Sequence, residues 1–110
     1  DWSVWLDEIY TGRNFEATII GFDSTLAPND LMRRYVSDNS KNMCNYTNAK
    51  YDSFYQLAVE TTDENKKIEY YKELQKILSD DAAAVFIQDP PLLVAVSKQL
   101  EGYTFYPVYV

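Results

Sequence analysis

The sequence predicts an α/β fold of the mixed α+β type, in which a mixed sheet is flanked by helices. Apolar residues recur at helical spacing between residues 49 and 79, which indicates two amphipathic helices. Four other segments are short, apolar and rich in β-branched residues: 16–22, 82–88, 92–97 and 103–110. At 110 residues, the chain amounts to one domain or less.

The N-terminal segment is expected to form a helix. Its apolar residues follow the spacing i, i+3, i+4 and i+7 of one helix face: Trp2, Trp5, Leu6 and Ile9. Asp1 or Ser3 is suited to cap its start, and Gly12 to the left-handed position after its last turn. Residues 16–22 then form a strand that we expect to be buried on both faces.

Three helices are expected before the second strand. Asn29 is suited to cap a short helix over residues 30–36, and Asn48 to cap a helix over residues 49–60. The third helix runs to about Ser79. Its inward-facing residues lie three or four positions apart: Ile68, Tyr71, Leu74 and Leu78.

The junction between the two longer helices matches a Thr-x-x-Glu capping box, formed by Thr61 and Glu64. After the helices, Pro90 and Pro91 interrupt regular strand pairing, and Gly102 marks a turn before the last strand. The predicted order is therefore one helix, one strand, three helices and three strands.

The composition argues against several classes of function. With 17 acidic and 10 basic residues, the net charge of −7 disfavours nucleic acid and anionic membranes as partners. The chain has no histidine and one cysteine, Cys44, so it lacks a Ser-His-Asp triad, an internal disulfide and the usual zinc ligands. Its three glycines form no phosphate loop. We expect no catalytic residue, no metal and no cofactor, and we expect that the protein is not an enzyme.

The polar loop at residues 23–28 is the candidate ligand site. Ligands of open α/β sheets gather at the carboxyl ends of strands, and this loop follows the strand predicted at residues 16–22. An ordinary surface loop explains the same residues equally well. The residues expected to contact a ligand are aromatic or polar: Phe22, Asp23, Ser24, Thr25 and Asn42.

A series of short motifs occurs in one order along nearly the whole chain. They are Gly21-Phe22 before a polar loop and Pro28, Asn42 with Asn45-Tyr46-x-Asn48-x-x-Tyr51-Asp52, Ala58, Thr62-Asp63, Tyr70-Tyr71, Ile77-Leu78-x-Asp80-Asp81-Ala82, and Leu100-x-Gly102-Tyr103. In this order the chain resembles the C-terminal part of the family 5 extracellular solute-binding proteins. These are the peptide- and nickel-type binding components of ATP-binding cassette (ABC) importers.

The resemblance implies that residues 1–110 are a single fragment, the C-terminal portion of the second lobe of a longer bilobed protein. The fold would be a partial lobe of a periplasmic-binding-protein-like type II fold. The full-length protein would capture a peptide or other small solute and deliver it to the membrane permease of the importer. It would be extracytoplasmic: a membrane-anchored lipoprotein at the cell surface, or periplasmic.

The candidate loop departs from the pattern of this family. Many peptide-binding members carry an Asp-Pro there, whose Asp pairs with the amino group of the ligand. Here Ala27 precedes Pro28, and Phe22 replaces the usual Trp. Anchoring of a free amine would therefore require Asp23 as a substitute, and the resemblance does not imply the identity of the ligand.

Two alternatives remain at this point. The first is an acidic, tyrosine-rich protein-interaction domain without a small-molecule ligand, in which the ten tyrosines form a docking face. The second is a small hydrolase that uses a pair of carboxylates in a pocket. If the chain is a partial lobe, strands that would pair with absent parts of the lobe leave open edges, so we expect the isolated chain to dimerise or exchange strands.

Overall fold

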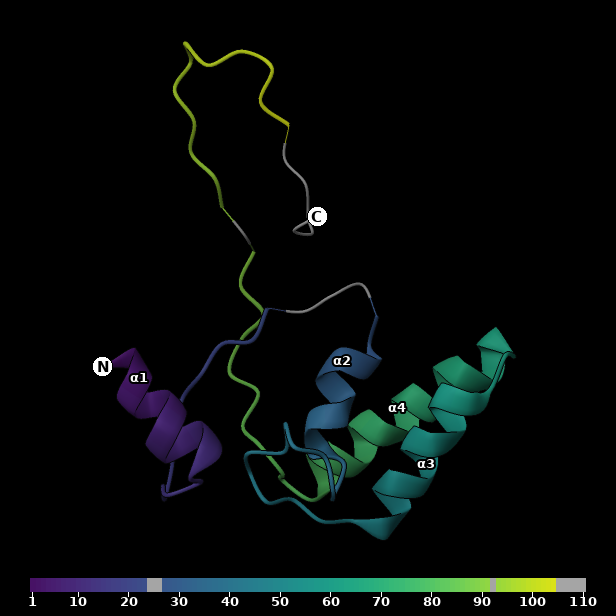
Figure 1. Cartoon of the computed structure of the whole chain (residues 1–110). Helices are drawn as coiled ribbons and strands as arrows, with labels where there is room; N and C mark the ends of the chain where they lie inside the picture. The colour runs from purple at the N-terminus through teal and green to yellow at the C-terminus, as the bar shows by residue number, and fades with distance from the viewer. Residues whose placement is uncertain (24–26, 92, 105–110) are drawn as a thin grey trace.

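The computed structural model describes residues 1–23, 27–91 and 93–104, and its regular elements are helices (Figure 1). In chain order they are α1 (Trp2–Val4), the π-helix η1 (Trp5–Thr11), α2 (Asn29–Met32), the 3₁₀ helix η2 (Arg33–Tyr35), α3 (Ala49–Glu60) and α4 (Glu64–Asp80). Helices α3 and α4 lie side by side and make the most extensive contact between elements. Helix α2 lies beside α4.

The predicted sheet is absent from the part of the chain that the structure describes. Residues 16–22 and 82–88 form no strand, and neither do residues 93–97. Leu92 and residues 105–110 lie outside the described residues, so only the start of the fourth predicted strand is described. The prediction of a mixed sheet flanked by helices is therefore wrong here. β-branched composition favours extended backbone, but a strand also requires a neighbour for its N–H and C=O groups. The described residues of these segments pair with no other strand.

The core lies where α2 and η2 meet α3 and α4. Tyr51 of α3 and Leu74 of α4 are fully buried, and the Tyr51 hydroxyl donates a 2.7 Å hydrogen bond to the backbone oxygen of Met32. This bond joins the short helix to the long pair. The buried residues of the core cluster are Met32, Tyr35, Tyr51, Ala58, Leu74, Ile77 and Leu78.

Three tyrosine rings fill one end of this core. The rings of Tyr35, Tyr46 and Tyr51 meet pairwise in edge-to-face contacts, with centroids 5.8–6.4 Å apart. This geometry places the positive edge of one ring against the negative face of the next. Seven of the eight described tyrosines are buried or half-buried, and Tyr103 is the exposed one. Most of the described tyrosine surface therefore packs inside the protein.

The start of each long helix is closed by one side chain. The predicted cap of α3 is confirmed, because the Asn48 Oδ1 accepts hydrogen bonds from the backbone N–H groups of Lys50 and Tyr51 at 2.9 and 3.0 Å. The predicted capping box of α4 is wrong. Asp63 caps this helix through bonds from Asn65 and Lys66, whereas Thr61 is the residue that follows α3.

The buried stripe of α4 agrees only in part with the predicted one, and Tyr71 is half-buried. Leu74 and Leu78 are buried as expected, but Ile68 is 51% exposed. Ile77, which the spacing did not select, is 6% exposed. Both isoleucines fit an apolar helix face, so the surfaces packed against α4 decide which of them is covered.

The N-terminal helix begins as predicted and ends differently. Asp1 caps it by accepting a 2.8 Å hydrogen bond from the Ser3 N–H. The chain then continues as a π-helix to Thr11. Gly12 has a φ of −75°, and the left-handed position falls on Arg13, with a φ of 54°. Gly12 is needed for a different reason, because a Cβ there would lie 2.8 Å from the backbone oxygen of Glu8. The short helix α2 likewise begins at Asn29 without a side-chain cap.

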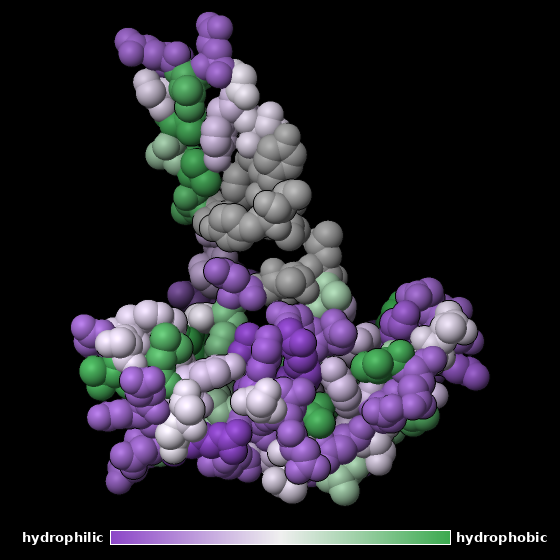
Figure 2. Space-filling view, viewed as in Figure 1, coloured by the Kyte–Doolittle hydropathy of each residue, from purple (hydrophilic) through white to green (hydrophobic). Residues whose placement is uncertain are grey.

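Beyond α4 the chain leaves the helical core as an extended segment that we call the C-terminal arm, residues 85–91 and 93–104. It projects away from the helices (Figure 1), and apolar side chains lie on its surface (Figure 2). Val85 and Leu93 are 86% and 85% exposed. The arm therefore contributes little buried surface to the core.

Candidate functional site

Phe22 stands at the start of the candidate loop and is partly covered by the chain itself. Its ring is 39% exposed, and the Arg34 guanidinium carbon lies 4.1 Å from the ring centroid. This is a cation–π contact, which holds the end of residues 16–22 against η2. Asp23 is exposed to solvent. Ser24 and Thr25 lie outside the described residues, so their role as ligand contacts stays a prediction, as does that of Phe22 and Asp23.

The far end of the same loop borders a surface groove of about 300 Å³. We call it the loop groove. The loop forms one wall, and α3 and α4 form the others, so three separate segments of the chain meet there. It is at the small end of the range for ligand pockets, large enough for a dipeptide-sized solute or part of one. Its lining residues are Ala27, Pro28, Asn29, Ala58, Val59, Lys67 and Tyr71.

Lys67 and Tyr71 supply charged and polar groups to the loop groove. The Lys67 ammonium donates a 2.8 Å hydrogen bond to Glu64 Oε1, and this bond raises the pKa of Lys67. Burial raises the pKa of the Tyr71 hydroxyl, so it remains a neutral donor at physiological pH. A cation and a hydroxyl donor beside the apolar surface of Ala58 and Val59 suit a carboxylate attached to a small apolar group.

Asn42 has a structural role in the loop between η2 and α3. It is 1% exposed, and its side-chain amide donates hydrogen bonds to the backbone oxygens of Val36 and Tyr46, at 3.1 and 2.8 Å. Its Oδ1 accepts a bond from the Tyr46 N–H at 3.2 Å. These bonds satisfy backbone groups that a buried loop would otherwise leave unpaired. Contact of Asn42 with a ligand stays a prediction.

Asp81 joins that loop to the end of α4, a link that the sequence analysis missed. Its Oδ2 accepts hydrogen bonds from the Tyr46 hydroxyl at 2.6 Å and from the Asn48 amide at 2.7 Å. These two bonds lower the pKa of the Asp81 carboxyl. Burial, and then the bond to Asp81, raise the pKa of Tyr46 to about 12. In the sequence, Asp81 fits a motif and a solvated turn at the end of a helix, and no spacing rule connects it with residues so far upstream.

Lys67 and Tyr71 were also missed as site residues. Lys67 fits a solvated helix face, and Tyr71 fits an apolar one, so each has an ordinary explanation in the sequence. Their spacing of i and i+4 places them on one side of α4, which is the signal that was available. Only the packing of the loop against this side makes it a groove.

Two further features are absent from the described residues. They contain no group of three or more His, Cys, Asp and Glu side chains that could hold a metal ion. None of their helices is both long and apolar enough to cross a membrane.

Comparisons with known proteins find partial similarities to peptide-binding proteins. The chain is 33% identical, over 63 residues, to a probable D,D-dipeptide-binding periplasmic protein of Escherichia coli K12; the match covers 57% of this chain and 12% of that protein. It is 29% identical, over 73 residues, to a dipeptide-binding protein of the same organism, covering 66% of this chain and 14% of that protein. No protein-family model and no solved structure matches the chain. The chain is thus similar, over more than half of its length, to a small part of two bacterial dipeptide-binding proteins.

Proposed function

We propose that this chain is part of the substrate-binding component of an ABC importer, which captures a peptide or other small solute and delivers it to a membrane permease. The similarity to two dipeptide-binding proteins, over 57% and 66% of the chain, carries this proposal. The ordered motifs of the family 5 solute-binding proteins support it. The protein would act outside the cytoplasm, in the periplasm or as a lipoprotein at the cell surface.

In this proposal the chain binds its ligand and does not transform it. Binding energy comes from the apolar walls of the loop groove and from a few hydrogen bonds. Lys67 pairs with the carboxylate of a peptide, and the Tyr71 hydroxyl donates to the same group. Phe22, Asp23, Ser24 and Thr25, which precede the groove residues in the chain, stay predicted ligand contacts. The relatives are much longer than this chain, so these residues would form part of a site that other segments complete.

The burial of the tyrosines weakens the alternative of a protein-interaction domain. Such a domain needs a contiguous exposed aromatic surface. Among the described tyrosines, all but Tyr103 are buried or half-buried. Most of these rings pack in or against the core, so the described tyrosines do not form one docking face.

The test is a titration of the isotope-labelled chain with Ala-Ala and with D-Ala-D-Ala, followed by NMR. We expect shift changes at Ala58, Val59 and Tyr71. Amidation of the peptide carboxyl should weaken binding, because a neutral amide cannot form an ion pair with Lys67. Peptides recovered after incubation should be intact by mass spectrometry. Cleavage of the peptide would contradict the proposal, as would the absence of binding by both this chain and any longer polypeptide that contains it.

Neighbouring lysines provide a matched pair of variants. Lys67→Met removes the ammonium group of the loop groove, whereas Lys66→Met removes an exposed charge outside its lining. We expect Lys67→Met to weaken binding by about fivefold, the size of a partly exposed charge-assisted contact, and Lys66→Met to leave it unchanged. Equal effects of both variants would show that the peptide responds only to overall charge.

A further inference from the structure

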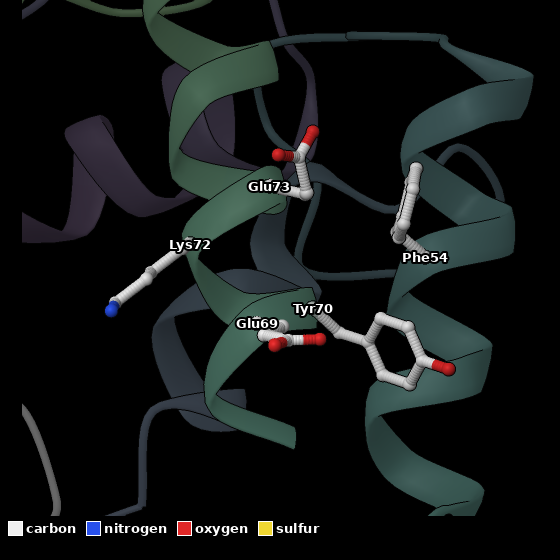
Figure 3. Close-up of a pocket in the computed structure, with 5 residues that line it drawn as sticks. All are labelled: Phe54, Glu69, Tyr70, Lys72 and Glu73. Carbon is white, nitrogen blue, oxygen red and sulfur yellow. The ribbon is translucent and has the colours of Figure 1, made fainter. Parts of the chain in front are cut away.

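A second groove lies on the α3–α4 pair and shares no lining residue with the loop groove (Figure 3). It has a volume of about 290 Å³. We call it the acidic groove. It is lined by two aromatic rings, two carboxylates and one lysine: Phe54, Tyr70, Glu69, Glu73 and Lys72. Phe54 and Tyr70 also pack against the core, but neither the core nor the proposed peptide contact involves the two carboxylates beside them.

The two rings of the acidic groove present apolar faces beside each other. Phe54 projects from α3 and Tyr70 from α4, with ring centroids 6.0 Å apart and planes tilted by 54°. The Lys50 ammonium lies 5.7 Å from the Phe54 centroid, so a cation of the chain itself already sits against this ring. The negative face of an aromatic ring attracts cations, and the attraction grows when the cation is shielded from water.

The two carboxylates of the groove make no close pair with the described residues, although the charge of Glu73 helps to raise the pKa of Lys76. On the same helix, Lys67 pairs with Glu64 and Lys76 pairs with Asp80. Glu69 and Glu73 form neither an ion pair nor a side-chain hydrogen bond with the described part of the chain. They stand at i and i+4, where like charges repel each other. A cation placed between them relieves this repulsion.

Lys72 does not fill the position of such a cation. Figure 3 shows its ammonium group pointing away from Phe54 and Tyr70, on the other side of the α4 backbone. Lys50 belongs to α3, and its ammonium group lies near the Phe54 ring only. The space between the rings and the two carboxylates is therefore complementary in charge to a cation supplied from outside.

We propose that the acidic groove is a docking site for a basic segment of a partner protein, which inserts a lysine or arginine side chain between the rings and the two carboxylates. The aliphatic stem of that side chain would cover the rings, and its charged end would meet Glu69 and Glu73. The excess negative charge of the chain favours the approach of a basic partner. The site goes beyond the proposed function, because it uses none of the residues of the loop groove.

The probe is an acetylated and amidated pentalysine peptide, which carries no terminal charges. Titration into the isotope-labelled chain should shift the NMR signals of Phe54, Glu69, Tyr70 and Glu73. Signals of Ala58 and Val59, in the loop groove, should stay in place. Shifts spread evenly over the acidic surface of the chain would overturn the proposal, since they would indicate attraction to net charge alone.

Charge-matched variants separate the groove from overall charge. The double variant Glu69→Gln with Glu73→Gln should weaken pentalysine binding at least about fivefold. The double variant Glu8→Gln with Glu16→Gln removes two exposed carboxylates elsewhere and should change the affinity by less than about twofold. Equal weakening by both pairs would overturn the proposal. All four positions are at the surface or partly so, and circular dichroism checks that each variant keeps its helices.

Two further measurements test the role of the rings and the kind of ligand. Tyr70→Phe keeps the ring and should keep the affinity for pentalysine, because the ring face makes the contact. A large loss of affinity would assign the contact to the hydroxyl and overturn the proposed placement of the cation against the ring. Spermine serves as a small polyamine probe. Tighter binding of spermine than of pentalysine would overturn the assignment to a protein partner, whereas weaker binding supports it.

Discussion

The helical core and the C-terminal arm contain similar apolar residues, which are buried in the core and exposed in the arm. Leu74 in α4 is fully buried, while Leu93 in the arm is 85% exposed. A helix satisfies its own backbone hydrogen bonds, so it needs neighbours only for its side chains. An extended segment needs a partner for its backbone as well. The difference between the two regions therefore lies in the partners available to each, and not in how hydrophobic they are.

The largest expected effect contrasts two leucine truncations. Leu74→Ala should lower the free energy of unfolding by about 2–5 kcal/mol, because it leaves a cavity in the core. Leu93→Ala should change it by no more than about 0.5 kcal/mol, because that side chain is already in solvent. Urea denaturation of the two variants measures both. Substantial destabilisation by Leu93→Ala would show that the arm packs against the core.

The next effect concerns the loop organised by Asn42. Asn42→Ala should lower the free energy of unfolding by about 1–3 kcal/mol, because the backbone groups of Val36 and Tyr46 lose a buried partner. Asn14→Ala is the control, since Asn14 is exposed and its side chain makes no hydrogen bond within the described residues. If thermal unfolding shows equal stability for the two variants, the hydrogen bonds of Asn42 do not organise the loop.

A smaller effect decides which residue caps α4. Asp63→Ala should destabilise the protein by about 1 kcal/mol, since two backbone N–H groups at the helix start lose their acceptor. Thr61→Ala should lower the free energy of unfolding less, because the Thr61 hydroxyl accepts a single bond, from the Asp63 N–H at 3.2 Å. Chemical denaturation monitored by circular dichroism provides the comparison. The reverse order would restore the capping box that the structure contradicts.

The link between Tyr46 and Asp81 predicts a dependence of stability on pH. Asp81 has a lowered pKa in the folded state, so its contribution is present above its ordinary pKa of 3.8 and is lost as the pH falls through the folded value. Tyr46 has a raised pKa, so its contribution is present below its ordinary pKa of 10.0 and is lost as the pH rises through about 12. Tyr46→Phe should flatten the melting-temperature profile at both ends. An unchanged profile would show that this hydrogen bond does not affect stability.

The arm should exchange its amide hydrogens faster than the two long helices do. Its described residues make one backbone hydrogen bond outside regular elements, from Leu100 to Ser97, whereas the amides of α3 and α4 are protected by their helices. The sequence predicts that isolated chains dimerise or exchange strands. If the arm takes part in this association, exchange in the arm should slow as the protein concentration rises. Concentration-independent exchange together with a monomer in sedimentation would contradict strand exchange.

The two long helices could be predicted because their signals are local. Asn48 caps α3 through groups two and three residues away, and residues 49–60 match the observed bounds of this helix. Local sequence does not decide whether a predicted strand forms. Ile19 and Val85 favour extended backbone whether or not a neighbouring strand exists. The candidate site divides in the same way. Phe22 and Asp23 could be selected from their position after a predicted strand. Lys67 and Tyr71 become neighbours of the loop only through packing.

The sequence by itself determined the helical segments, their spacing, the cap of α3 and the absence of histidine chemistry, because these depend on residues within one or two turns of each other. Only the tertiary structure decided that Ile77 is buried and Ile68 is not, that Asp81 receives the Tyr46 hydroxyl, and that two grooves form along the α3–α4 pair. Each of these depends on which surfaces meet. Burial and long-range hydrogen bonds are properties of pairs of segments, and the pairing arises from the packing of the whole chain.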